Sequence, residues 1–188
     1  MFESGSFVAE FVSPIDPIQI QPSGVDLTLD AVFRGCEPGR IARDGKRVGE
    51  REPVVPENGT ERDADGSDVD ANDAADGSGI ESGADGPGTD DPSVYRLSPG
   101  GYVARYAEEI EIPEGHIGFV YPRSSLMRNS CTVDTAVWDA GYRGRGEGLL
   151  EVYHEIEIER GARFAQFVLA RADHDGSYAG SYQGENVE

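Results

Sequence analysis

The chain has 188 residues, of which 36 are acidic and 16 are basic, so its formal net charge is −20. A chain of this length can form one domain with its own hydrophobic core. A surface this acidic repels the phosphates of nucleic acid, which excludes a general nucleic-acid binder. Because the sequence also lacks a membrane-length apolar stretch and an apolar, basic leader, we expect a soluble cytoplasmic protein without a membrane partner.

The basic residues are almost all arginine, since Lys46 is the only lysine. A surface rich in carboxylates and poor in lysine stays soluble at high salt, where its self-repulsion is screened. Residues 47–93 carry −11 of the charge, and the rest of the chain still carries −9. The acidic excess therefore extends over the whole chain and indicates a salt-loving organism.

The first predicted strand follows a polar turn. Residues 21–27 read Gln-Pro-Ser-Gly-Val-Asp-Leu, and Leu27, Leu29, Ala31 and Phe33 then continue as alternate positions of a strand. Within the turn, Asp26 is either a cap or a functional carboxylate.

Residues 47–93 interrupt the β pattern. They are mostly Asp, Glu, Gly, Ala, Ser and Pro, without an aromatic residue or an apolar period. Such a segment cannot bury enough surface to offset its ordering entropy. We therefore expect a disordered acidic insertion at 47–93, with residues 1–46 and 94–176 forming one β domain.

The second half of the chain also reads as β structure. Short alternating or apolar segments at 110–112, 117–121, 156–158 and 164–169 are separated by Pro-Gly and Gly-rich turns. This spacing predicts an all-β sandwich or barrel. The one short helix that we expect lies at Ser125–Ser130. Two cysteines and three scattered histidines are too few for a disulfide framework or a zinc site.

A first chemical cluster follows the apolar run at 117–121. Residues 121–130 contain Arg123 and Arg128 together with several hydroxyl groups. Guanidinium groups and hydroxyls in this arrangement can cradle a phosphate. The alternative is a solvated turn with a capped helix start, although an excess of arginine is unexpected in so acidic a chain.

A second cluster occupies residues 137–151. Asp139 lies beside Trp138, and a Tyr142-Arg143 pair and a Gly-rich turn follow before Glu151. The glycines at 144, 146 and 148 lack the preceding strand–helix context of a dinucleotide-binding fold. They are instead typical of a tight hairpin that needs positive φ angles.

These segments, in this order, resemble the successive motifs of the trimeric dUTPase and dCTP deaminase superfamily, and the archaeal dUTPases most closely. The resemblance covers essentially the whole chain outside the acidic insertion. It implies a distorted jelly-roll or β-barrel subunit, a homotrimer with shared active sites, and a deoxynucleoside triphosphate substrate bound with Mg²⁺. The motifs are Gly24-Val25-Asp26-Leu27, Pro122-Arg123-Ser124-Ser125-Leu126, Asp139-Ala140-Gly141-Tyr142-Arg143-Gly144 and Arg163-Phe164-Ala165-Gln166.

The resemblance also implies roles for single residues. Asp139 would contact the deoxyribose and orient the attacking water, and Tyr142 would pack against the sugar. The tail at 177–188, with Tyr182 and Gln183, would close over the nucleotide, although the usual glycine- and serine-rich dUTPase tail is absent. The residues that match the phosphate-binding positions are Arg123, Ser124, Ser125, Arg128 and Gln166.

The reaction that we favour is hydrolysis of dUTP to dUMP and diphosphate, with backbone groups of Thr132–Val137 reading the uracil. The alternative is dCTP deamination, alone or with dUTP hydrolysis, in which Glu151 would shuttle protons. Two extra residues precede Glu151 relative to the deaminase pattern, and no zinc-deaminase motif is present. A trimer that binds dUTP without turnover is a third, less favoured reading.

Overall fold

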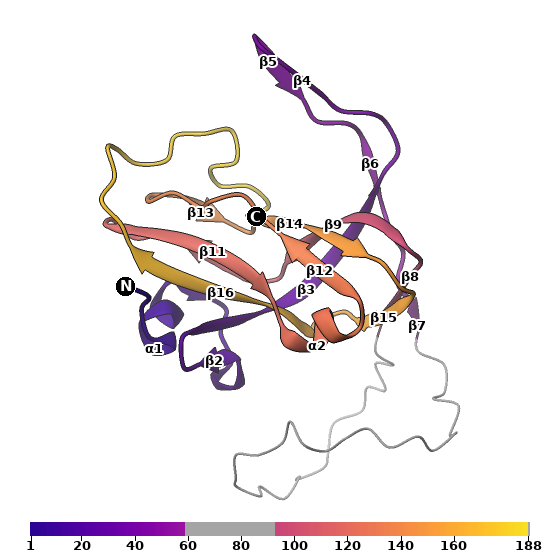
Figure 1. The fold of residues 1–188 in the computed structure, drawn as a ribbon, viewed down its shortest axis with the longest axis horizontal. Helices are drawn as coiled ribbons and strands as arrows, with labels where there is room; N and C mark the ends of the chain where they lie inside the picture. The colour runs from indigo at the N-terminus through magenta and orange to yellow at the C-terminus, as the bar shows by residue number, and fades with distance from the viewer. Residues whose placement is uncertain (59–92, 188) are drawn as a thin grey trace, which may run out of the picture.

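The computed structural model describes residues 1–58 and 93–187 of the chain (Figure 1). Its main sheet is antiparallel, and its first and last strands come into contact, so the sheet nearly closes on itself as a barrel. The predicted all-β fold is confirmed. In spatial order the strands are β11 (His116–Pro122), β16 (Arg163–Arg171), β3 (Gly24–Gly35), β9 (Gly100–Tyr106), β14 (Glu147–Val152) and β12 (Cys131–Asp134).

Smaller elements border the barrel. The helix α2 (Ser124–Arg128) lies within one residue of the predicted start, and no helix among the described residues is long enough to cross a membrane. The others are α1 (Gly5–Val8), the 3₁₀ turns η1 (Ala9–Phe11) and η2 (Pro17–Gln19), and the strands β1 (Val12–Ser13), β2 (Ile20–Gln21), β8 (Ser93–Leu97), β10 (Glu109–Glu111), β13 (Arg143–Gly144) and β15 (Ile156–Glu159).

The long strand β3 departs from the predicted alternation. Leu27 and Leu29 are fully buried as expected, but further along Val32 is buried while Ala31 and Phe33 are only half-buried. The register with β9 shifts between Leu29 and Ala31. A β-bulge there adds one residue to the strand and exchanges its two faces, which strict period-two reading cannot foresee.

Residues 47–58, which were predicted as the start of the disordered insertion, include two short strands. β6 (Arg51–Pro53) pairs with the end of β3, and β7 (Glu57–Asn58) pairs with β8. The pairing partners satisfy the backbone of a segment whose own composition is too polar to predict a strand. The remaining residues of the predicted insertion, 59–92, lie outside the described part of the chain.

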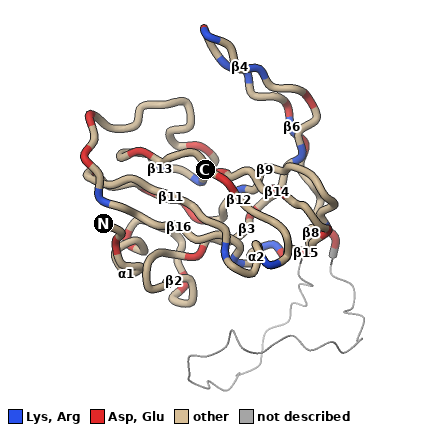
Figure 2. Tube along the Cα trace, viewed as in Figure 1, with Lys and Arg blue, Asp and Glu red and all other residues tan. Residues whose placement is uncertain are grey.

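Between β3 and β6 the chain forms a ribbon of β4 (Arg40–Ala42) and β5 (Gly45–Arg47) that stands away from the barrel (Figure 1). Basic residues gather on this ribbon and again beside α2, whereas acidic residues are scattered over the described surface (Figure 2). The local positive charge beside α2 coincides with the predicted phosphate-binding segment.

An aromatic cluster fills the barrel end beneath residues 138–142. The Tyr106 ring lies 5.7 Å from that of Phe164, and the Trp138 ring lies 5.0 Å from Tyr142 and 6.0 Å from Phe167, measured between centroids. The first pair is stacked, the second edge-on and the third tilted, and such pairs add to the stabilisation that burial alone provides. This packing makes a rigid support for the chain around Asp139.

Candidate active site

A cavity of about 650 Å³ opens between β14, the turn before β13 and the C-terminal tail, residues 177–187. Val103 and Leu149 contribute apolar wall, and Asp139, Tyr142 and Tyr182 contribute polar groups. A cavity of this size and mixed lining is typical of a small-molecule site. The structure thus brings together three of the residues singled out from the sequence.

The backbone around Asp139 is fixed on both sides. Trp138 exchanges two hydrogen bonds with Gly118 on β11, of 2.9 and 3.2 Å, and the Gly141 amide donates to the Ile112 carbonyl at 2.8 Å. The amide of Tyr142 donates to the carbonyl of Asp139 at 3.2 Å. The turn is therefore held in place, while Asp139 itself is exposed at the cavity.

The glycines of this region are needed for close packing more than for backbone angles. Gly141 has a φ of +84°, but Gly144, Gly146 and Gly148 do not have positive φ, in contrast to the predicted tight hairpin. A Cβ on Gly146 would lie 2.2 Å from the Trp138 ring, and one on Gly148 would lie 2.5 Å from the Tyr106 hydroxyl. Any larger residue would displace the aromatic cluster that supports the cavity.

The aromatic wall of the cavity is tied to the tail. Tyr142 is 6% exposed, and its hydroxyl donates a hydrogen bond of 2.8 Å to Oε1 of Glu185. Burial, followed by the bond to Glu185, raises the pKa of Tyr142 well above its ordinary value, so the hydroxyl stays protonated. Burial likewise raises the pKa of Glu185, against the lowering effect of the Tyr142 hydroxyl.

The tail docks on the edge of β13 through backbone bonds. The Gly184 amide donates to the Arg143 carbonyl at 2.8 Å, and the Arg145 amide donates to the Glu185 carbonyl at 3.0 Å. Gln183 also binds this edge, since its Nε2 donates to the Gly141 carbonyl at 3.0 Å. Tyr182 lines the cavity, whereas Gln183 does not.

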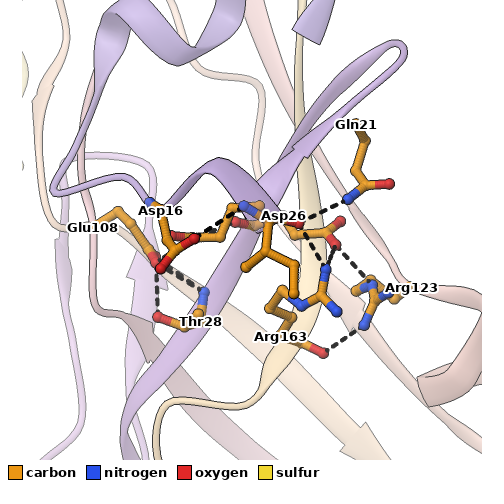
Figure 3. A network of polar contacts seen from close by, with 9 residues as sticks. Asp16, Gln21, Asp26, Thr28, Glu108, Arg123 and Arg163 are labelled. Carbon is orange, nitrogen blue, oxygen red and sulfur yellow. Dashed lines mark hydrogen bonds and ion pairs between the residues drawn. The ribbon is translucent and has the colours of Figure 1, made fainter. Parts of the chain in front are cut away.

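Four of the five predicted phosphate-binding residues lie in a second place, at the start of α2 or within it. Arg123 is the residue directly before α2, and its side chain turns to Asp26 (Figure 3): its Nε lies 3.1 Å from Oδ2 of Asp26, and its Nη1 donates to the Arg163 carbonyl at 3.2 Å. Ser124, Ser125 and Arg128 are exposed on α2. None of these α2 residues lines the cavity that contains Asp139.

Asp26 is the centre of this second cluster. It is 2% exposed, and Arg163 Nη1 approaches the same Oδ2 at 3.2 Å (Figure 3). Burial raises the pKa of the Asp26 carboxyl, and the guanidinium groups of Arg123 and Arg163 act in the opposite direction. Gln166 lies opposite Asp26 in the pairing of β16 with β3, so the first, second and fourth motifs meet here.

A neighbouring buried carboxylate holds the start of β3. Glu108 accepts hydrogen bonds from the backbone amide of Thr28 at 3.0 Å and from the Thr28 hydroxyl at 2.7 Å (Figure 3). It also accepts one from Gln19 Nε2 at 2.7 Å. Three donors satisfy a charge that would otherwise be costly to bury. This network gives Asp26 a fixed backbone position.

The predicted proton shuttle, Glu151, lies on β14 and accepts a hydrogen bond of 2.6 Å from the Tyr153 hydroxyl. It does not line the cavity. The carboxylate of β14 that does so is Glu147, four residues earlier on the same face of the strand. In the sequence, the only sign that Glu147 lies on the same face of the strand as Leu149 and Glu151 is their spacing of two residues.

Arg51 is the second cavity residue that sequence reasoning missed, because it lies within the predicted insertion. Its guanidinium group forms a two-pronged pair with Glu147, with distances of 2.5 and 2.7 Å. Arg51 and Glu147 are distant in the sequence. The pairing of β6 with β3 brings Arg51 close to Glu147 on β14.

Comparisons with known proteins agree with this architecture. Residues 89–172 match the family model described as dCTP deaminase-like. A protein of Halobacterium salinarum named "probable deoxyuridine 5′-triphosphate nucleotidohydrolase" is 52% identical over 188 residues, which is 100% of this chain and 97% of that protein. The chain belongs to the archaeal dUTPase family.

Other dUTPase relatives and a solved structure extend the likeness. A protein of Aeropyrum pernix with the same name is 35% identical over 89% of this chain and 87% of its own length. The fold is similar to that of the 2′-deoxycytidine 5′-triphosphate deaminase from Agrobacterium tumefaciens, with a TM-score of 0.54, 17% identity, and coverage of 91% of this chain and 48% of that one. The haloarchaeal dUTPase relative supports the predicted adaptation to salt.

Proposed function

We propose that this chain hydrolyses dUTP to dUMP and diphosphate. The observation that carries the proposal is the placement of Asp139, exposed on a fixed turn at a nucleoside-sized cavity whose wall includes Tyr142. The full-length likeness to proteins named deoxyuridine 5′-triphosphate nucleotidohydrolase supports the same reaction.

In the proposed mechanism, Asp139 orients a water molecule for in-line attack on the α-phosphorus and accepts its proton. The new bond joins the water oxygen to the α-phosphorus, and the bond from the α-phosphorus to the bridging oxygen breaks. Diphosphate leaves with the electron pair, so dUMP and diphosphate are the products. Tyr142 would pack against the deoxyribose and hold the sugar over Asp139.

The triphosphate requires cationic groups, and among the described residues the arginines of α2 are separate from the Asp139 cavity. We propose that a second copy of the chain brings Arg123, Ser124, Ser125, Arg128 and Gln166 to the cavity, in a homotrimer. Two-pronged guanidinium contacts are well suited to phosphate oxygens.

Mg²⁺ would enter with the triphosphate and neutralise charge that develops on the departing diphosphate. The described residues contain no cluster of three or more carboxylate, histidine or cysteine ligands. The substrate's phosphate oxygens would hold the ion, with the exposed Asp139 carboxylate beside them at the cavity.

The test is incubation of the purified protein with dUTP and, separately, with dCTP, in the presence of Mg²⁺ and high salt. We expect diphosphate and dUMP from dUTP, without ammonia from dCTP. Absence of diphosphate from dUTP would contradict the proposal, and ammonia release from dCTP would establish the deaminase alternative. Light scattering on the same sample measures the subunit number, and a monomer would contradict the shared-site arrangement.

A further inference from the structure

An ion cluster forms one wall of the cavity. Glu147, which is 15% exposed, accepts hydrogen bonds from Arg51 at 2.5 and 2.7 Å and from Arg105 at 3.2 Å through both Nε and Nη2. Asn186 Nδ2 of the tail adds a contact of 3.4 Å. The two guanidinium carbons lie 4.6 and 4.8 Å from the centre of the Phe33 ring, which fixes both arginines from the other side.

The two oxygens of this carboxylate are used unequally. Four of the five donor contacts to Glu147 converge on Oε1, and Oε2 accepts only the 2.5 Å bond from Arg51 Nη1. Glu147 therefore acts as the anchor of Arg51.

Arg51, in contrast, keeps donors to offer. A guanidinium group has five N–H bonds, and Arg51 uses one from each terminal nitrogen for Glu147. Its side chain is 30% exposed, and it is the only cationic residue among the described residues that line the cavity. Arg105 shares the same carboxylate and the same ring but does not line the cavity.

We propose that Arg51 is a specificity-determining residue that donates to the 4-oxo group of uracil. This inference rests on the proposed function and adds to it the group that separates uracil from cytosine. At position 4 an oxo pyrimidine presents an acceptor, whereas cytosine presents an amino donor. A guanidinium group can only donate hydrogen bonds. It therefore pairs with the 4-oxo group of uracil, whereas opposite the 4-amino group of cytosine the guanidinium N–H and the amino N–H are both left unpaired.

The fixed plane of Arg51 makes this discrimination effective. Because Glu147 and Phe33 hold the guanidinium group, it cannot turn away from a mismatched amino group without breaking a two-pronged ion pair. A site that is built to hydrogen-bond one group rejects an analogue that lacks it far better than an apolar pocket does.

The experiment compares Arg51→Met with Arg105→Met as a matched control. Both variants remove one arginine from Glu147 and from the Phe33 ring, but only the first changes the cavity wall. The readouts are kcat/KM for diphosphate release from dUTP and from dCTP, and calorimetric binding of dUMP and dCMP to the assembled protein.

For Arg51→Met we expect the dUTP-to-dCTP preference to fall by about 10- to 100-fold, the usual effect of one unmatched polar contact. In Arg105→Met the ratio should stay within about twofold of the wild type. Equal loss on both nucleotides in the two variants would overturn the inference and leave only a structural ion pair.

A conservative variant covers the case in which Arg51→Met does not fold. Arg51→Lys keeps the charge but not the two-pronged geometry, so we expect a partial loss of preference, and an unchanged preference would overturn the inference. If the wild type releases no diphosphate, the proposed function fails. The dUMP and dCMP affinities of the same variants then decide the role of Arg51 independently.

Discussion

The hydroxyl of Tyr142 and the carboxylate of Glu185 form a hydrogen bond of 2.8 Å that joins the wall of the cavity to the C-terminal tail. The residue expected to contact the sugar is therefore the same residue that fastens the tail. If Tyr142 contacts the sugar as proposed, this bond couples substrate binding to the position of the tail.

The first prediction concerns the pH dependence of tail docking. Burial raises the pKa of Glu185 in the docked tail, so docking is most favourable below the ordinary carboxyl pKa and weakens as the pH rises through the raised value. Glu185→Gln keeps an acceptor for Tyr142 and removes this dependence. Hydrogen exchange of the Gly184 and Arg145 amides should slow in the variant at neutral pH, by less than about tenfold. If exchange of these amides is unchanged or faster in the variant, the predicted pH dependence of tail docking is contradicted.

The second prediction concerns Asp139. If this carboxylate orients the water, Asp139→Asn should lower kcat on dUTP by about 10²- to 10⁴-fold, with little change in dUMP affinity or thermal stability. Asp134→Asn, an exposed residue of β12 that does not line the cavity, is the control. Turnover of Asp139→Asn at the control rate would exclude the mechanism.

The third prediction concerns the buried carboxylate of the second cluster. Asp26→Asn leaves the guanidinium groups of Arg123 and Arg163 without their counter-charge. We expect a loss of about 3 kcal/mol in the free energy of unfolding, since breaking a buried pair costs far more than breaking a surface pair.

The matched control for Asp26→Asn is Asp30→Asn. Asp30 pairs with Arg160 at 2.7 Å, but that arginine is 58% exposed. Denaturant titration of the control should show a loss of no more than about 1 kcal/mol. If both variants lose the same free energy of unfolding, the buried pairs of Asp26 stabilise the protein no more than a surface ion pair does.

The fourth prediction uses Trp138, the only tryptophan of the chain, as a probe. Gly146→Ala places a Cβ 2.2 Å from the Trp138 ring and should cost about 1–3 kcal/mol of stability. The fluorescence maximum should shift and kcat should fall, because Asp139 follows Trp138 directly. Gly101→Ala, whose Cβ would meet Leu149 at an ordinary 3.8 Å, should change neither.

The fifth prediction separates two deletions. Asn58 and Ser93 are direct partners in the pairing of β7 with β8, so a two-residue Asn-Gly turn can replace residues 59–92. At high salt we expect the melting temperature and the rate of dUTP turnover to stay unchanged after this replacement. Deleting residues 51–91 also removes Arg51 and the strands β6 and β7, and should destabilise the protein. If the two deletion variants have equal melting temperatures, this prediction is wrong.

Local pattern predicted most of the β structure, but not the features that depend on pairing. The alternation through Leu27 and Leu29 was visible in the sequence, while the bulge that buries Val32 depends on β9. Likewise Arg51 lies in a polar stretch that becomes a strand only because the end of β3 lies beside it.

The motifs of the candidate site were found in the sequence, but their spatial grouping was not. Asp26 and Gln166 lie opposite each other on adjacent strands and Arg123 pairs with Asp26, whereas Asp139 lies at a separate cavity. Motif order along a chain does not report which motifs meet within one subunit. Glu147 was hidden for a related reason, since its neighbour Glu151 matches the expected motif better.

The pairing of Asn58 with Ser93 has a consequence for how this protein can vary. Because the chain leaves and re-enters the sheet at one ladder position, the number of residues between them is decoupled from barrel geometry. Residues 59–92 carry a large share of the negative charge. A change in the length or charge of this stretch therefore alters the net charge of the molecule, and its solubility in salt, without requiring a different strand pairing at Asn58 and Ser93.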